Sequence, residues 1–364
     1  MSHCVHFGIC GGCASDNRNQ PDKRDLLIKA LARAGYAQAE VAELVVAPLH
    51  SRRRVDLAAT RKGAEITLGL HRARSSDVVD MQECALLRPE LLPLLQPLRV
   101  LLRSLNCFKR EVAVAINWLD NGPDILIRAD APVTQPDRTR MIAFAREHGA
   151  PRISVAEPKA LPEPVIILAN PSLRFAGVEV TPPPGGFLQP SVEGEAAITE
   201  AMLAGLPKLR NKSRIVELYA GCGTLSFALA AKARVEAYEG DEQAVYAADK
   251  AARAAGLAGR VAVTKRDLHR RPLLTQDFKN ADAVVLDPPF AGAAAQVKFL
   301  GGAGVGRIIY ISCNSDALAH DAAVLRQAGY KVLAATPIDQ FPYSENVESV
   351  VVFGNPPVFN GAYL

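Results

Sequence analysis

Short apolar runs alternate with amphipathic stretches throughout the second half of the chain. The apolar runs are rich in β-branched residues, as in buried strands, and the stretches between them have the length and composition of helices. This alternation predicts a parallel sheet with crossover helices. The predicted strands are 214–219, 235–240, 260–266, 283–287, 307–312, 331–336 and 348–354, and the predicted helices are 224–233, 242–255 and 315–327.

The first half of the chain has a different pattern, in which pairs of alternating runs flank turn sequences. Residues 55–60 and 65–71 lie on either side of one turn, and residues 112–118 and 125–130 on either side of another, which predicts two hairpins. The segment 181–186 contains three prolines and two glycines and cannot continue a strand or helix. We therefore predict an α+β domain over residues 1–185 and an α/β domain over residues 186–364.

Composition indicates a folded chain and excludes a disordered or fibrous one, since 49% of the 364 residues are hydrophobic and 22% are charged. The best candidate for a membrane helix, 91–102, is interrupted by two prolines, a glutamine and an arginine, so we expect no membrane span. The first residues lack the pattern of a secretory signal, which predicts a cytoplasmic, reducing location. Seven cysteines in such a chain favour metal ligation or nucleophilic thiols over disulfides.

The net charge of +4 lies entirely in the first half. Residues 1–185 hold 24 lysines and arginines against 20 acidic residues, and the second half is neutral with 18 of each. If the chain binds a nucleic acid, the first half is the expected contact region. Arg52, Arg53 and Arg54, together with Arg72 and Arg74, form either a phosphate-binding patch or a solvated hairpin face.

A glycine turn follows the first strand of the second half. Gly221 and Gly223 lie where a strand ends and a helix starts, and Glu239 ends the next strand about 20 residues on. Glycines allow close backbone approach to a ligand, and a carboxylate at this spacing grips a ribose diol. The pattern predicts a site for an adenosine-containing cofactor, and Asp287, in Asp-Pro-Pro-Phe at the same sheet edge, strengthens it over the alternative of a plain tight turn.

Two further residues are typical of covalent catalysis. Cys313 directly follows the strand 307–312, just before a predicted helix start, whose field is expected to lower the pKa of the thiol. Glu348 opens the last predicted strand and is expected to reach the same pocket. A thiolate with a carboxylate forms a nucleophile and base pair.

The remaining cysteines suggest a metal centre near the amino terminus. Cys4, Cys10, Cys13 and Cys84 supply four thiols, the first three closely spaced, and their spacing alone allows either structural zinc or an iron–sulfur cluster. Cys107 is expected to be core packing. Cys222, in the glycine turn, is expected to be there for backbone reasons.

Four segments resemble the S-adenosylmethionine-dependent RNA 5-methyluridine methyltransferases. They are FLQPS (187–191), ELYAGCG (217–223), YISCNSDALAHDAAVLRQAGY (310–330) and PIDQFPYSENVESVVVF (337–353). The resemblance implies a class I, Rossmann-like methyltransferase domain. It implies that Cys313 attacks uracil C6 and Glu348 removes the C5 proton. It also implies that S-adenosylmethionine is held by Gln189, Tyr219, Glu239 and Asp287, with Asp267 a weaker match, beside the glycine turn of Gly221 and Gly223.

The amino-terminal cysteines are similar to those of a family branch that carries a 4Fe-4S cluster. That branch resembles the 23S rRNA uracil-C5 methyltransferases, so the expected partner is 23S rRNA, with tRNA as the alternative, and we expect a monomer. The chain departs from the family pattern at Phe290, Ser315 and Asn346, where the family has Arg, Pro and His. Two other functions stay open here: an amino methyltransferase of nucleic acid using 287–290, and a metal-stabilised RNA-binding protein with a decayed methyltransferase domain.

Overall fold

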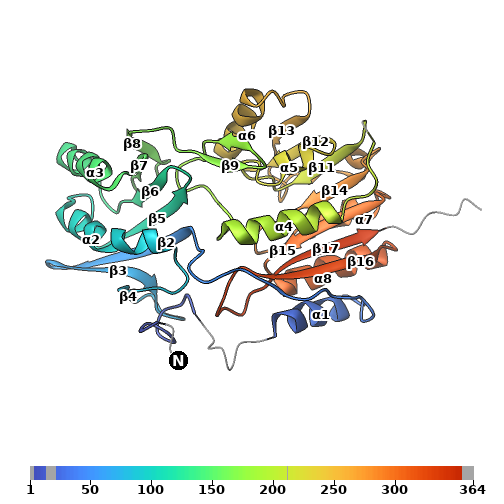
Figure 1. The fold of residues 1–364 in the computed structure, drawn as a ribbon, viewed down its shortest axis with the longest axis horizontal. Coiled ribbons are helices and arrows are strands. Elements are labelled where there is room, and N and C mark those ends of the chain that lie inside the picture. Colours follow the sequence, from blue (N-terminus) through green and yellow to red (C-terminus); the bar gives the residue numbers. More distant parts are fainter. Residues whose placement is uncertain (1–3, 14–21, 211, 355–364) are drawn as a thin grey trace, which may run out of the picture.

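The computed structural model describes residues 4–13, 22–210 and 212–354, which build two large β-sheets side by side (Figure 1). The larger sheet has eight strands in the order β1-β16-β17-β15-β14-β11-β12-β13. Its elements are β1 (Val45–Val46), β11 (Arg214–Leu218), β12 (Arg234–Glu239), β13 (Val261–Lys265), β14 (Ala283–Leu286), β15 (Arg307–Ser312), β16 (Lys331–Asp339) and β17 (Glu348–Gly354), with helices α1 (Lys23–Arg33), α4 (Val192–Ala204), α5 (Ser226–Ala230), α6 (Glu242–Ala254), η2 (Thr275–Phe278), α7 (Ala294–Gly301) and α8 (Ser315–Gln327).

The parallel sheet predicted for the second half is confirmed. Strands β11 to β15 pair in parallel, and β17 inserts antiparallel between β15 and β16. Successive residues contribute to different core clusters, since Ile215 and Ile309 lie in one cluster and Val216 and Ile308 in another. Both faces of the sheet are therefore covered, which explains why its strands are apolar throughout rather than alternating.

Two element boundaries differ from the sequence prediction. The helix expected at 224–233 is only α5, because residues 221–225 form turns before it. The strand expected at 331–336 continues to Asp339, because its end pairs with β17 on one side and with β1 on the other. That extension carries the chain toward Gln340, which matters for the site below.

The amino-terminal segment contributes to the larger sheet. The apolar residues Leu27, Leu31 and Ala34 form one stripe on α1 and pack in the core cluster of that sheet, and β1 pairs in parallel with β16. Lys23, which is buried, donates a hydrogen bond to Asp339 at the end of β16, with Nζ and Oδ1 2.5 Å apart. The division of the chain near residue 185 stays a prediction, and the structure differs from it in placing α1 and β1 against the second sheet.

The smaller sheet has seven strands in the order β4-β3-β2-β5-β6-β7-β8, and both predicted hairpins are present in it. The helices α2 and α3 lie beside this sheet (Figure 1). Its elements are β2 (Arg54–Lys62), β3 (Glu65–His71), β4 (Val78–Asp80), η1 (Pro89–Leu94), α2 (Leu95–Ser104), β5 (Glu111–Leu119), β6 (Gly122–Arg128), α3 (Gln135–His148), β7 (Arg152–Ala156) and β8 (Glu163–Ile167), and a separate small hairpin is formed by β9 (Leu173–Phe175) and β10 (Val178–Val180).

The segment 187–191 is joined to the start of β2. The Arg53 backbone N–H donates to the Pro190 carbonyl at 2.8 Å, and the Arg53 side chain donates to the Gln189 carbonyl at 3.1 Å and to Glu195 of α4 at 2.5 Å. Arg53 is buried, so these bonds hold the segment firmly between the two sheets. Among the described helices, none is long and apolar enough to cross a membrane.

Candidate functional site

The glycine turn after β11 is fixed by Glu239. One carboxylate oxygen of Glu239 accepts from the Gly221 N–H and the other from the Asp241 N–H, both at 2.8 Å. Tyr219, Gly221 and Gly223 all have positive φ. A Cβ at Gly223 would lie 2.5 Å from the Phe227 ring, so this position requires glycine. The turn thus leaves a backbone loop at the carboxyl edge of the sheet, where open α/β sheets bind ligands.

Asp287 lies at the same edge, directly after β14, and begins a chain of side-chain hydrogen bonds. The Gln189 amide donates to Asp287 Oδ2 at 3.3 Å. The Gln340 amide donates in turn to Gln189 Oε1 at 3.0 Å and to Glu348 Oε2 at 2.7 Å. Gln189, Gln340 and Glu348 are buried. Two carboxylates, one from β17 and one beyond β14, are therefore connected through two glutamine amides.

Cys313 and Glu348 are cross-strand neighbours. The antiparallel register of β15 and β17 pairs Ser312 with Ser349, so the next residues along, Cys313 and Glu348, lie beside each other at the strand ends. The charge of Glu348 acts on the Cys313 thiol and raises its pKa. The charge of Asp287 also acts on both residues, so the structure brings the three groups close together. That Cys313 and Glu348 work in one pocket stays a prediction.

The surroundings of Cys313, Asp287 and Glu348 disfavour the ionised form of each side chain. Burial, followed by the charges of Glu348 and Asp287, raises the pKa of the Cys313 thiol to about 12. The expectation that the helix start lowers this pKa is therefore wrong, because burial and two carboxylates outweigh the field of α8. Burial raises the pKa of Asp287 to about 7, and burial with the charge of Asp287 raises that of Glu348 to about 8. A cation bound here would lower all three.

Asp267, the remaining predicted cofactor residue, forms side-chain hydrogen bonds within its own loop. Its Oδ1 accepts from the backbone N–H groups of His269 and Arg270, both at 3.1 Å. The backbone N–H of Arg266, next to it, donates to the Glu239 carbonyl at 2.6 Å. Asp267 therefore lies at the same sheet edge as Glu239 and is held by its own turn.

Sequence reasoning missed two buried polar residues of this region. Gln340 lies within the segment 337–353, which resembles the methyltransferase family, but the sequence assigned no role to its amide. Glu217, on β11, accepts from Ser226 Oγ at 2.5 Å, and burial raises its pKa to about 8. An acid within an apolar strand and a glutamine just after one were the available signals, since buried polar groups need partners.

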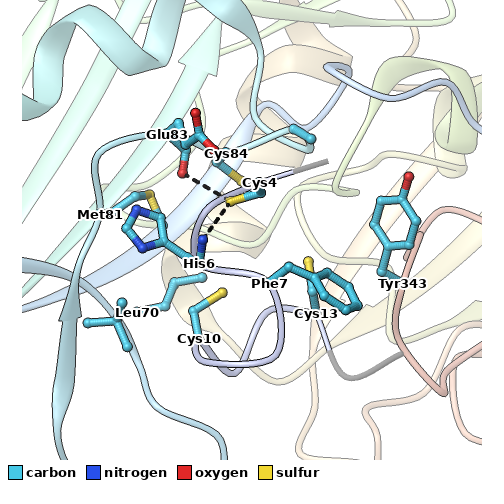
Figure 2. Close-up of a pocket in the computed structure, with 12 residues that line it drawn as sticks. Cys4, His6, Phe7, Cys10, Cys13, Leu70, Met81, Glu83, Cys84 and Tyr343 are labelled. Atoms are coloured by element: carbon cyan, nitrogen blue, oxygen red, sulfur yellow. Dashed lines mark hydrogen bonds between the residues drawn. The ribbon is translucent and has the colours of Figure 1, made fainter. Parts of the chain in front are cut away.

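Figure 2 shows a second site, in which Cys4, Cys10, Cys13 and Cys84 line one pocket. A hydrogen bond from the Cys13 thiol lowers the pKa of Cys10 to about 6, whereas burial raises that of Cys4. The Cys4 sulfur accepts from the His6 N–H at 3.4 Å. The structure thus brings these four cysteines to one pocket, and their role as ligands stays a prediction.

The thiols surround the pocket without forming a site for a single ion. Within residues 4–13, 22–210 and 212–354, no group of three or more His, Cys, Asp or Glu side chains is placed to hold a metal ion. Cys107 and Cys222 are buried elsewhere, as expected for packing and for the glycine turn.

Comparison with known proteins gives matches over nearly the whole chain. Residues 182–355 match the family described as tRNA (Uracil-5-)-methyltransferase. The chain is 37% identical over 358 residues to an RNA methyltransferase of Rhizobium meliloti, covering 95% of this chain and 84% of that protein. It is 30% identical over 366 residues to the 23S rRNA (uracil(1939)-C(5))-methyltransferase RlmD of Pectobacterium atrosepticum, covering 96% and 79%.

The solved tRNA (uracil-54, C5)-methyltransferase of Pyrococcus abyssi, in complex with S-adenosyl-L-homocysteine, has a similar fold. The TM-score is 0.68 at 19% sequence identity, and the match covers 91% of this chain and 81% of that one. This likeness confirms an α/β S-adenosylmethionine methyltransferase fold with an additional amino-terminal β domain.

Proposed function

The chain belongs to the RNA uracil-C5 methyltransferase family, an S-adenosylmethionine-dependent enzyme class, and we propose that Cys313 and Glu348 perform its chemistry here. The observation that carries this assignment is their position as neighbours at the ends of β15 and β17, beside Asp287. The same family membership sets aside an amino methyltransferase and a decayed, non-enzymatic protein.

In this proposal the Cys313 thiolate adds to uracil C6, forming a C–S bond and moving electron density onto C5. S-adenosylmethionine supplies the methyl group that C5 then takes. The Glu348 carboxylate removes the C5 proton, the C6–S bond breaks, and the C5–C6 double bond and the thiolate are restored. The target uridine has to leave its stack for C6 to reach Cys313, so we expect the RNA to open locally.

The glycine turn and its neighbours are proposed to hold S-adenosylmethionine. Each Glu239 oxygen that accepts a backbone N–H keeps a second lone pair for a ribose hydroxyl. Tyr219, Gly221 and Gly223 form the loop beside it. Asp287 and Gln189 lie toward Cys313, and Asp267 lies next to Glu239, which supports the full set suggested by the resemblance.

Trapping with an RNA that contains 5-fluorouridine tests the nucleophile, because fluorine at C5 cannot leave as a proton and the adduct persists. We expect a denaturation-resistant protein–RNA adduct that requires S-adenosylmethionine and is lost in Cys313→Ala. Cys107→Ala is the matched control, since that thiol is buried far from the site, and it should trap normally. An RNA that is methylated by the enzyme but never trapped would refute covalent catalysis.

We propose 23S rRNA as the substrate, with tRNA as the alternative. The similarity to a protein named as a 23S rRNA methyltransferase extends over 96% of this chain and supports the first. Mapping 5-methyluridine in total RNA from a deletion strain distinguishes them, because the missing modification identifies the RNA. We also propose a monomer, which sedimentation of the purified protein tests.

The cysteine pocket is proposed to hold a 4Fe-4S cluster through Cys4, Cys10, Cys13 and Cys84. Thiolates are the ligands such clusters use, and the four cysteines line one pocket. The ultraviolet–visible spectrum of anaerobically purified protein, with iron and sulfide analysis, tests this. A colourless protein that contains zinc would instead support a structural zinc site.

A further inference from the structure

A basic groove lies between the cysteine pocket and the segment 187–190. Its lining includes Arg52, Arg54, Arg72 and Arg74, together with Phe187. We call it the arginine groove. The sequence singled out four of these five residues, but the proposed chemistry uses none of them.

Positive charge in the arginine groove is poorly neutralised by the protein. Its lining contains one acidic residue, Asp56, which pairs with Arg54 at 3.1 Å. Among the described residues, Arg72 and Arg74 form no ion pair with a carboxylate within 4.0 Å, whereas the charge of Arg52 interacts with Cys84, Cys13 and Asp56. Guanidinium groups that share a concave surface without carboxylates repel one another and favour a polyanionic ligand.

One wall of the groove is held in place by the cysteine loop. Cys10 forms a β-bridge with Arg72, and the Gly11 N–H donates to the His71 carbonyl at 2.7 Å. A Cβ at Gly11 would lie 2.9 Å from that carbonyl oxygen, so only glycine allows this approach. The turn that carries Arg72 and Arg74 is therefore fixed by the loop that carries Cys10 and Cys13.

The other end of the groove is formed by residues that adjoin two buried glutamines of the candidate active site. Leu188 and Pro190, which line it, flank Gln189, and Phe341, which also lines it, follows Gln340. Gln189 and Gln340 are the two amides that connect Asp287 and Glu348. The groove therefore ends at residues next to these glutamines in the chain, whereas Cys313 lines a separate cavity with Phe290 and Asn314.

Phe187 offers a surface for bases at that end. Its side chain is 64% exposed, and the Arg54 guanidinium lies 5.2 Å from the ring centre. Exposed aromatic rings beside arginines are typical of surfaces that bind single-stranded nucleic acid, where bases stack and phosphates pair with cations.

We propose that the arginine groove binds an unpaired RNA segment next to the target uridine, with Arg72 and Arg74 on its phosphates and Phe187 against a base. The proposal rests on the proposed function, because it extends the same RNA toward the cysteine pocket. It favours unpaired RNA over duplex, since a duplex does not present its base faces to an aromatic side chain.

The test compares Arg72→Ala/Arg74→Ala with wild type in the full chain, using a single-stranded RNA oligonucleotide that contains uridine. We expect roughly tenfold weaker RNA binding near physiological salt, and a salt dependence of log K that is shallower by about 1.4, from two lost phosphate contacts. Affinity for S-adenosylmethionine should be unchanged. Phe187→Trp should also give a fluorophore whose emission is quenched when the oligonucleotide binds.

Arg128→Ala/Arg146→Ala is the matched control, because both side chains are exposed in the same half of the chain and lie outside the groove. Equal weakening in the control, an unchanged salt slope, or tighter binding of duplex than of single strand would overturn the proposal. Trapping by 5-fluorouridine RNA separates this result from the chemistry. Wild type that traps, with groove variants that bind normally, refutes only the groove, whereas wild type that never traps refutes the proposed function.

Discussion

At the residue scale, Gln340 stabilises the ionised form of Glu348. Both hydrogens of its amide are used, one on Glu348 and one on Gln189, so the amide has a single favourable orientation. Its bond to Glu348 favours the ionised carboxylate, whereas burial and Asp287 oppose ionisation. Burial and Asp287 thus outweigh the hydrogen bonds that Glu348 accepts from Gln340 and from the Ser349 backbone, and its pKa stays raised.

This balance predicts a pH dependence. Since the pKa of Glu348 is raised to about 8, its ionised fraction should rise with pH with a midpoint near 8. Ionisation of the Cys313 thiol, whose pKa is raised to about 12, adds a separate rise at higher pH. Gln340→Leu removes the donor that lowers the pKa of Glu348, so the midpoint of that residue should move to higher pH. Single-turnover release of tritium from RNA labelled at uracil C5 measures it.

Gln296→Leu is the control for that experiment, because Gln296 is also a buried glutamine whose amide bonds the backbone at Leu273. Both variants should lose about 1–3 kcal/mol of stability from unpaired partners. Only Gln340→Leu should shift the pH midpoint, and identical midpoints in the two variants would contradict the role given to Gln340.

At the element scale, the first turn of α4 supports Gln340. A Cβ at Gly194 would lie 2.6 Å from Gln340 Oε1 and 2.9 Å from Gln340 Cβ. Glycine to alanine in a helix ordinarily stabilises by about 1 kcal/mol. Here we expect Gly194→Ala to lower the melting temperature and to slow C5 proton release, because Gln340 has to move.

Gly259→Ala serves as the comparison, since a Cβ there meets nothing within 4 Å and the backbone is not left-handed. Its stability and rate should stay near those of wild type. Normal activity and a raised melting temperature in Gly194→Ala would show that the space behind Gln340 is not tight.

Most strands of the larger sheet could be predicted from the sequence. Both of its faces are buried, so most of its strands are nearly continuous apolar runs. The sequence did not predict the pairing of β1 with β16, since two valines carry no periodic signal and their partner lies far along the chain. Cys313 and Glu348 were identified from motifs, but their adjacency depends on β17 inserting between β15 and β16. The raised pKa of Cys313 required the burial and charges of the folded site.

At the scale of the whole molecule, the cysteine pocket contacts both halves of the chain. The Phe7 and Tyr343 rings meet edge to face, with centres 6.3 Å apart, so the cysteine loop touches the connection between β16 and β17. The same loop fixes Arg72 and Arg74. Loss of whatever the four thiols bind should therefore weaken RNA binding and leave the glycine turn intact.

Cys84→Ala tests this prediction. We expect weaker binding of single-stranded RNA, by roughly the tenfold expected of the groove variant, and unchanged affinity for S-adenosylmethionine measured by calorimetry. Cys107→Ala, a buried thiol of the same sheet domain outside the pocket, should leave both affinities unchanged. If Cys84→Ala weakens the two affinities equally, the pocket supports the fold in general and not the groove.

The pairing of β1 with β16 also has a consequence for how the protein is made. β1 leaves the ribosome long before β16 is synthesised, so it has no partner strand during most of translation. The edge of the sheet can form only after β16 has been made. A fragment that starts at residue 186 lacks β1 and α1 and exposes the sheet edge and apolar surface that they cover, which favours aggregation. The sheet that carries Cys313 and Glu348 is therefore complete only when β16 and β17 have been made and have met β1.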